Sequence, residues 1–395
     1  MGKKIKQGSL STRSIHSGED REKYADSITT PIVQSSTFVF KDCKDIEDYT
    51  IHKKERFEYG RYGNPTEKVA QRRLADLEGA EDCILLSSGM MAITTTLLTL
   101  LKTGDHIVIT DDVYKKTLEL CNTFLKKLGI ECTVVSFNDY DKIESSIKEN
   151  TRFIFSESPT NPYLNVFDLV KLKKIADKHK VLTIIDSTFA TPYNQRPIDF
   201  GVDIVIHSCT KYLAGHNDVL GGAILGRAEL LDDIRKLHKA IGGAIDPHAC
   251  YLLIRGLKTF PLRVKAQNES ALKVARFLEG HSKIEKVYYP FIESHRHHKI
   301  ATEQMKGGGG VVSFDIKGDL DGAKRFLDAL KLIYIGPSLG GVESLITHPA
   351  IVTYYDYTRE QRYEIGITDT LIRLALGIED PQDIISDLDE ALSKV

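Results

Sequence analysis

Short apolar runs alternate with amphipathic stretches from about residue 66 to residue 226. The apolar runs are rich in branched residues and end at polar residues or glycine, which is typical of strands buried on both faces. The intervening stretches, such as 66–80 and 166–180, have helical spacing. This alternation predicts an α/β unit with a mostly parallel sheet covered by helices on both faces. The predicted strands lie within 83–89, 106–110, 131–137, 152–158, 181–186, 202–208 and 221–226.

The pattern changes toward both ends of the chain. After residue 255 it predicts a long polar helix at 262–281, a strand at 311–316 and closing helices at 321–330 and 381–395. We therefore expect an α/β domain at 59–255 and a smaller C-terminal α+β domain at 256–395. Residues 1–58 show little periodicity and predict an extended arm that folds against another surface, such as a neighbouring subunit.

The amino-acid composition argues against nucleic acid and membranes as binding partners. The 395 residues carry a formal net charge of -2, so no overall field attracts nucleic acid or an anionic membrane. Six cysteines without CxxC spacing fit reduced thiols better than a disulfide framework or a zinc site. No secretion signal or apolar run of about 20 residues is seen, so we expect a cytoplasmic protein without a membrane span.

Polar residues follow several predicted strands at the edge where ligands bind in parallel α/β sheets. Gly89 and Met90 open a predicted helix after the first strand, and their free N–H groups suit a phosphate, although an ordinary strand-to-helix turn has the same pattern. Asp186 ends another apolar run, where a desolvated carboxylate needs a cationic partner. A helix cap or an internal salt bridge is the alternative for Asp186.

Lys211 lies in the loop after a third strand, beside the hydroxyls of Ser208 and Thr210. On its own it could be a solvated turn residue, a phosphate ligand or a covalent catalyst. Taken with the other strand ends, it completes the set that pyridoxal phosphate needs: phosphate donors, a carboxylate for the ring nitrogen and a lysine for the aldehyde. Tyr114, just after another strand, can supply the expected aromatic cover for the ring.

Ordered motifs from about Thr12 to the C-terminus resemble the Cys/Met-metabolism (trans-sulfuration) family of fold-type I pyridoxal-phosphate enzymes, and most closely its plant-type cystathionine γ-synthases. The motifs are IHSGE, YGRYGNPT, SSGMMA, ESPTNP, IDSTFATP, HSCTKYLAGHNDVLGG, RGLKTF, PSLGGVES and LIRLALGIED. The resemblance implies a seven-stranded, mostly parallel sheet with a smaller C-terminal α+β domain. It also implies pyridoxal 5'-phosphate as cofactor and amino acids as small-molecule substrates.

The resemblance assigns roles on the cofactor side. It implies that Lys211 forms the Schiff base with the cofactor, that Asp186 pairs with the pyridinium nitrogen and that Tyr114 stacks on the ring. The implied phosphate contacts are Gly89, Met90, Ser208 and Thr210, with Tyr59 and Arg61 reaching in from a neighbouring subunit. Shared sites of this kind imply a homotetramer built as a dimer of dimers.

On the substrate side, Asn161 resembles the residue that contacts the cofactor 3-oxygen, and Arg373 resembles the clamp for the substrate α-carboxylate. A guanidinium fork fits a carboxylate bidentately. Ser338 and Glu343 resemble substrate-pocket residues, and a glutamate there suits the distal amino group of a cystathionine-like molecule. A core-edge salt bridge for Arg373 and a solvated loop carboxylate for Glu343 are the alternatives.

The family resemblance predicts a γ-replacement that forms cystathionine from cysteine and a phospho-, succinyl- or acetyl-homoserine ester. Cystathionine γ-lyase, homoserine-ester sulfhydrylase and methionine γ-lyase activities are the alternatives. Many members carry small residues or a cysteine after the stacking tyrosine, whereas this chain has Lys115 and Lys116. The hypothesis is that Lys116 or Lys115 holds an anionic leaving group, and a surface lysine is the alternative.

Two further motifs are expected to carry no chemistry. The SHRHH run contains His295, His297 and His298, and we expect it to be a mobile surface segment and not a metal site. The glycines 307–310 precede a predicted strand and indicate a bulge or tight strand entry.

Overall fold

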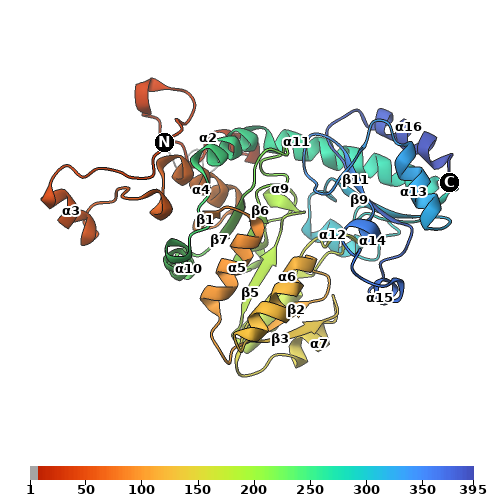
Figure 1. Cartoon of the computed structure of the whole chain (residues 1–395), viewed down its shortest axis with the longest axis horizontal. Helices are drawn as coiled ribbons and strands as arrows, with labels where there is room; N and C mark the ends of the chain where they lie inside the picture. The colour runs from red at the N-terminus through yellow and green to blue at the C-terminus, as the bar shows by residue number, and fades with distance from the viewer. Residues whose placement is uncertain (1–7) are drawn as a thin grey trace.

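The computed structural model describes residues 8–395 (Figure 1). Its larger sheet has seven strands in the order β1-β7-β6-β5-β4-β2-β3. Strands β2 to β6 run parallel, and β7 is antiparallel to both β1 and β6. The predicted seven-stranded, mostly parallel sheet is confirmed. The strands are β1 (Asp82–Leu86), β2 (His106–Thr110), β3 (Glu131–Val135), β4 (Thr151–Glu157), β5 (Leu182–Asp186), β6 (Ile204–Ser208) and β7 (Gly222–Gly226).

Helices cover both faces of this sheet because its strands are apolar on both sides. Ile184 and Ile206 pack on one face with Ile93 of α5 (Gly89–Leu100), whereas Ile185 packs on the other with Leu172 of α8 (Leu169–His179). The remaining helices of this part are α4 (Pro65–Glu78), α6 (Lys115–Glu119), α7 (Tyr140–Ser145), α9 (Thr191–Asn194), α10 (Ala228–Ile241), the π-helical turn η3 (Leu120–Leu125) and the 3-10 turn η4 (Pro197–Phe200).

A single long helix, α11 (Pro247–Gly280), runs from the large sheet to the C-terminal part of the chain (Figure 1). The sequence predicted this helix only from residue 262; it begins earlier because Asp246 caps its N-terminus and Leu253, Leu257 and Phe260 continue its buried face. The domain boundary predicted at 255/256 falls inside the helix and stays a prediction.

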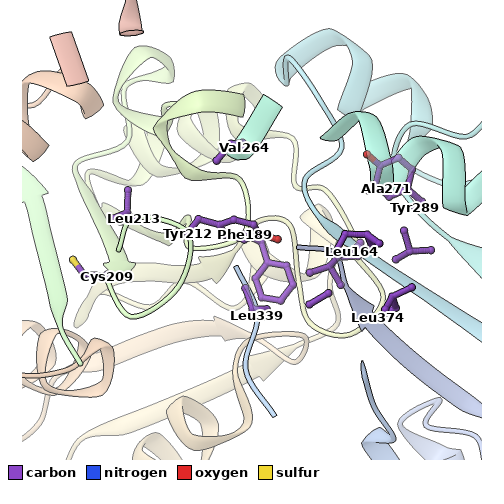
Figure 2. Close-up of a cluster of buried hydrophobic side chains, with 14 of the residues drawn as sticks. Leu164, Phe189, Cys209, Tyr212, Leu213, Val264, Ala271, Tyr289, Leu339 and Leu374 are labelled. Carbon is purple, nitrogen blue, oxygen red and sulfur yellow. The ribbon is translucent and has the colours of Figure 1, made fainter. Parts of the chain in front are cut away.

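The C-terminal part contains a second sheet in the order β10-β11-β12-β9-β8. Its strands are β8 (Ile284–Tyr288), β9 (Val311–Ile316), β10 (Tyr334–Ile335), β11 (Leu345–Thr347) and β12 (Leu371–Ala375). Its helices are α12 (His298–Gln304), α13 (Leu320–Ala329), α14 (Pro349–Val352), α15 (Arg359–Glu364) and α16 (Pro381–Leu392). Figure 2 shows the buried cluster where the two parts meet, with Tyr212 and Phe189 of the large domain near Leu339 of the smaller one.

The N-terminal arm projects away from the body of the molecule, with α3 (Cys43–Thr50) at its far end (Figure 1). Tyr24, Ile28 and Val39 on this arm are each more than four-fifths exposed. Before the projecting segment, α2 (Leu10–His16) packs against α4 and α11, and the 3-10 turns η1 (Tyr24–Asp26) and η2 (Gly60–Tyr62) lie on either side of α3 along the chain. The sequence analysis missed α2 and α3, which are stabilised by the side-chain caps Ser9 and Asp42.

The histidine run differs from its predicted placement. His295 is only 5% exposed and lies within hydrogen-bonding distance of the Tyr163 carbonyl, so the expectation of a mobile surface segment is wrong at this residue. Burial also lowers the pKa of His295 and His297 to about 4. In contrast, the tight strand entry predicted at residues 307–310 is confirmed, because a Cβ at Gly308 would meet the Tyr289 ring at 2.5 Å immediately before β9.

Candidate active site

Lys211 lies in the loop that follows β6, at the carboxyl edge of the large sheet. Its Nζ donates a hydrogen bond of 2.7 Å to Ser338 Oγ, so the smaller domain orients this amine. Burial, helped by the positive charge of Arg373, lowers the pKa of Lys211 to about 8. An amine with this pKa is partly neutral near pH 7, which is the form that attacks a carbonyl carbon.

The loop that carries Lys211 is held against α11 by a buried arginine. Arg263 is 4% exposed and donates hydrogen bonds to the carbonyls of Tyr212 at 2.8 Å and Gly256 at 2.7 Å. Gly215 makes room for the guanidinium, since a Cβ there would lie 1.7 Å from Arg263 Nη1. The sequence analysis missed Arg263, because its place in the predicted helix 262–281 does not show which carbonyls it meets.

Arg373, in β12, faces the same region from the smaller domain. It donates to Asn161 Oδ1 at 3.1 Å and to the Ser338 carbonyl at 2.9 Å. Its Nε is buried without a hydrogen-bond partner, and none of the ion pairs among residues 8–395 involves Arg373. Burial lowers the pKa of Arg373 to about 10. A buried guanidinium with an unused N–H fits an anionic ligand such as a carboxylate.

Gly89, Met90 and Ser208 lie together at the N-terminus of α5 and form a group, here called the anion cradle, whose N–H and hydroxyl donors could hold a phosphate. Gly89 and Met90 open α5, where first-turn N–H groups have no carbonyl of their own helix to bond. Gly89 lies directly against Ser208, since a Cβ at Gly89 would meet Ser208 Cβ at 3.0 Å. Thr210 lies in the loop that follows, and its Oγ1 accepts a hydrogen bond of 3.1 Å from the Gly221 N–H.

Asp186 ends β5 and is 8% exposed. Its Oδ1 accepts hydrogen bonds from the Thr188 N–H at 3.0 Å and from Thr188 Oγ1 at 2.6 Å. Burial raises its pKa. The cationic partner predicted from the sequence is not a side chain of residues 8–395, because their ion pairs do not include Asp186. A protonated ring nitrogen of a bound ligand is the partner that its position fits.

A second buried carboxylate, Glu157, was missed by the sequence analysis. It ends β4 directly beside Asp186 in the strand register and accepts a hydrogen bond of 2.8 Å from the Tyr114 N–H. Burial and the neighbouring Asp186 raise the pKa of Glu157 well above its ordinary value. Its position at a strand end, in the ESPTNP motif, was the signal that could have identified it. Tyr114 itself is 41% exposed at the start of α6.

Glu343 lies near an open cavity next to the Lys211 loop. Its Oε2 accepts a hydrogen bond of 2.8 Å from Asn217 Nδ2. The cavity, of about 470 Å³, is lined in part by Thr210, Asn217 and Ser338. Ser338 connects this cavity to Lys211, because its Oγ accepts the hydrogen bond from Lys211 Nζ.

Lys115 and Lys116 point to different surroundings. Lys115 Nζ bonds to the Thr353 carbonyl at 3.0 Å and to Asp356 at 2.5 Å, whereas Lys116 pairs with Glu119 at 2.6 Å on the exposed side of α6. Neither contact involves Lys211 or Arg373, so a role in holding a leaving group stays a prediction.

Tyr59 and Arg61 lie directly after the arm, with Arg61 in the 3-10 turn η2. Arg61 Nε donates to the Lys239 carbonyl at 2.9 Å, and its Cζ lies 5.0 Å from the Tyr59 ring centroid. These contacts do not include the anion cradle of the same chain. Their predicted contribution to a neighbouring subunit's site therefore stays a prediction.

Pyridoxal phosphate matches this edge of the sheet in the chemistry of each group, and the fold and the site together define a pyridoxal-phosphate-dependent enzyme. Lys211 would meet its aldehyde, Asp186 its ring nitrogen, and Gly89, Met90 and Ser208 its phosphate. The model of the family "Cys/Met metabolism PLP-dependent enzyme" matches residues 11–393, and this chain belongs to that family.

Three similar proteins show the range of activities in the family. Cystathionine gamma-synthase 1, chloroplastic, from Arabidopsis thaliana is 46% identical over 97% of this chain and 68% of that protein. An L-methionine gamma-lyase from Fusobacterium nucleatum is 43% identical over 99% of this chain and all of that protein. The crystal structure of metB from Corynebacterium glutamicum superposes with a TM-score of 0.92 at 36% identity and covers 98% of both chains. Transferases and lyases of sulfur amino-acid metabolism therefore share this architecture.

Proposed function

We propose that this protein forms L-cystathionine by γ-replacement, in which the leaving group on the γ-carbon of a homoserine ester is exchanged for the sulfur of L-cysteine. Phospho-, succinyl- and acetyl-homoserine are the candidate esters. The observation that carries the proposal is a pair of opposite charges in two neighbouring places. Arg373 offers a buried guanidinium near Lys211 for one carboxylate, and the exposed Glu343 offers a carboxylate next to Asn217, which lines the adjoining cavity. The 46% identity with a plant cystathionine γ-synthase supports the same reaction, γ-replacement.

The roles of the protein groups follow from their positions. When bound, pyridoxal phosphate supplies an electrophilic aldehyde and a ring that takes up the electron pair released at the substrate α-carbon. Arg373 binds the substrate α-carboxylate, and Asn161 and the Ser338 carbonyl hold the guanidinium in place. Lys211 removes the α-proton and then moves a proton at the β-carbon, with its amine oriented by Ser338 Oγ.

The other groups hold and cover the cofactor. Asp186 keeps a proton on the ring nitrogen, and its hydrogen bonds from Thr188 fix the carboxylate at the end of β5. Tyr114 covers the ring with its own aromatic face. Glu343 receives the distal amino group of the product, for which it must share or release its hydrogen bond from Asn217.

A γ-lyase activity is the second candidate, because an L-methionine γ-lyase aligns with 99% of this chain. Cystathionine γ-lyase would use Lys211, Asp186 and Arg373 in the same way, and a sulfhydrylase would use sulfide in place of cysteine. The absence of a cysteine immediately after Tyr114 in the sequence favours the synthase over a methionine γ-lyase.

Product analysis separates these activities. The purified, cofactor-loaded enzyme is incubated with each ester plus cysteine, with each ester plus sulfide, and with cystathionine or methionine alone. Cystathionine formed faster than homocysteine from at least one ester supports the proposal. Cleavage of cystathionine or methionine without measurable γ-replacement would replace it with a lyase, and Lys211→Ala is the control for cofactor-dependent turnover.

We also infer that Lys116 binds an anionic leaving group, that the enzyme is a homotetramer with shared sites, and that it acts in the cytoplasm. Lys116 follows Tyr114 by two residues, and its ion-pair partner among residues 8–395 is the exposed Glu119. The exposed apolar side chains of the arm support assembly with a second copy, and the six free cysteines support a reducing compartment. Within residues 8–395 no helix has the length and apolar character to cross a membrane.

A further inference from the structure

Lys115 is fixed in a cage built by the smaller domain. Its side chain is 14% exposed, and its Nζ bonds to the Thr353 carbonyl at 3.0 Å and to Asp356 at 2.5 Å. The same Nζ lies 4.3 Å from the ring centroid of Tyr357 and 5.2 Å from that of Tyr354. An ammonium with an ionic partner, a carbonyl acceptor and two aromatic neighbours has little freedom to move toward a substrate.

The residue before Lys115 is Tyr114, whose backbone is held from the opposite side. Its N–H donates to Glu157 Oε2 at 2.8 Å, and Glu157 is a buried residue of β4 in the large domain. Two consecutive residues at the start of α6 are therefore tied to two different domains. The position of the Tyr114 ring depends on both attachments.

The segment that holds Lys115 also belongs to the part of the chain that binds substrate in the proposed function. Thr353 follows α14, which leads out of β11, and β11 pairs with β12, the strand of Arg373. Through Lys115, a shift of the smaller domain relative to the large one would displace Tyr114 together with Arg373. The wall of a cavity of about 940 Å³ between the domains includes Lys115, so this attachment crosses the domain boundary.

We propose that Lys115 is a positioning residue that acts through Tyr114, setting the ring of Tyr114 relative to the cofactor and to Arg373. The proposal rests on the proposed role of Tyr114 as the residue that covers the cofactor ring. It separates the two adjacent lysines: Lys115 serves every substrate alike, and only Lys116 remains available to an anionic leaving group.

The test compares Lys115→Met, Lys115→Arg and a matched control, Lys286→Met. Lys286 lines the same cavity and also lies over a tyrosine ring, at 5.0 Å from the Tyr288 centroid, but it is not adjacent to Tyr114. The first measurement is the visible circular dichroism of bound pyridoxal phosphate without substrate, which reports the surroundings of the cofactor. The second is kcat with phospho-, succinyl- and acetyl-homoserine.

We expect Lys115→Met to change the visible dichroism and to lower kcat about tenfold or more for all three esters equally, because small displacements near the reacting groups are costly. Lys115→Arg should restore both signals toward wild type, since arginine keeps the ionic and aromatic contacts. Lys286→Met should leave the dichroism unchanged. In a Tyr114→Leu background, Lys115→Met should cause no further change in dichroism.

An unchanged dichroism in folded Lys115→Met, or a loss confined to the phospho ester, would overturn the proposal; the latter would make Lys115 a leaving-group ligand. Persistence of the full dichroic change in the Tyr114→Leu background would also overturn it. If Lys115→Met does not fold, Asp356→Asn removes the ionic partner on the exposed side and is expected to give the same change. Because the dichroism needs only bound cofactor, failure of γ-replacement by the wild-type enzyme would refute the proposed function without deciding the role of Lys115.

Discussion

The pKa of Lys211 leads to a quantitative prediction about cofactor capture. Burial and Arg373 lower this pKa from its ordinary value of 10.5 to about 8. At pH 7 the neutral, reactive fraction of the amine is then about 9%, against about 0.03% for an ordinary lysine, a ratio of roughly 300. We expect apoenzyme to react with pyridoxal phosphate with a rate that rises through a midpoint near pH 8, because the group reacts when deprotonated.

Stopped-flow absorbance at a series of pH values measures this midpoint, with Nα-acetyllysine as the reference amine for the titration of the cofactor itself. Arg373→Met removes the neighbouring positive charge and should move the midpoint to higher pH, whereas Arg373→Lys keeps the charge and should move it less. A wild-type midpoint at pH 10 or above would refute the argument from burial. An identical midpoint in Arg373→Met would refute the contribution of Arg373.

Three further predictions concern other parts of the site. Asp186→Asn should still bind cofactor, as seen by absorbance, but should lower kcat about 100-fold or more because the ring nitrogen loses its charged partner; an unchanged kcat would contradict this role. Lys116→Met should lower kcat/KM for phospho-homoserine about tenfold relative to acetyl-homoserine, which is the effect expected from losing one charge-assisted hydrogen bond. Equal changes in kcat/KM for both esters would show that Lys116 does not bind the leaving group. Gly215→Ala should lower the free energy of unfolding in urea by about 2–4 kcal/mol, whereas the control Gly104→Ala should lower it by about 1 kcal/mol. Both glycines have a positive φ, but only Gly215 borders Arg263. Equal losses in the two variants would show that the arginine contact contributes nothing.

The sheet, and the placement of the candidate cofactor residues at one edge of it, could be predicted because both follow local rules. Strands buried on both faces must be apolar throughout, which makes the run ending at Asp186 recognisable. The carboxyl ends of such strands meet at one edge, which places Gly89, Ser208 and Lys211 in a common region before any distance is known. The arm was predicted from its lack of periodicity, although its short helices depend on caps that the pattern does not reveal.

The remaining features depend on contacts between distant parts of the chain. The hydrogen bond from Lys211 to Ser338 joins residues 127 positions apart, so no local pattern contains it. Lys115 and Lys116 are adjacent and chemically identical, yet the short helix α6 turns one into the domain interface and the other toward solvent. His295 is buried because the segment around it packs beside Tyr163, which composition alone could not indicate.

The division of the site between the domains bears on how one architecture supports several reactions. The groups assigned to the cofactor, Lys211, Asp186 and Gly89, belong to the large sheet, whereas Ser338 and Arg373 approach from the smaller domain. The groups that face the cofactor can therefore stay constant while the smaller domain changes which substrate is bound. The smaller domain also acts on the Lys211 amine, because Arg373 lowers its pKa and Ser338 Oγ orients it through a hydrogen bond. We therefore expect substitutions around Ser338 to alter the ratio of products more than they alter cofactor affinity.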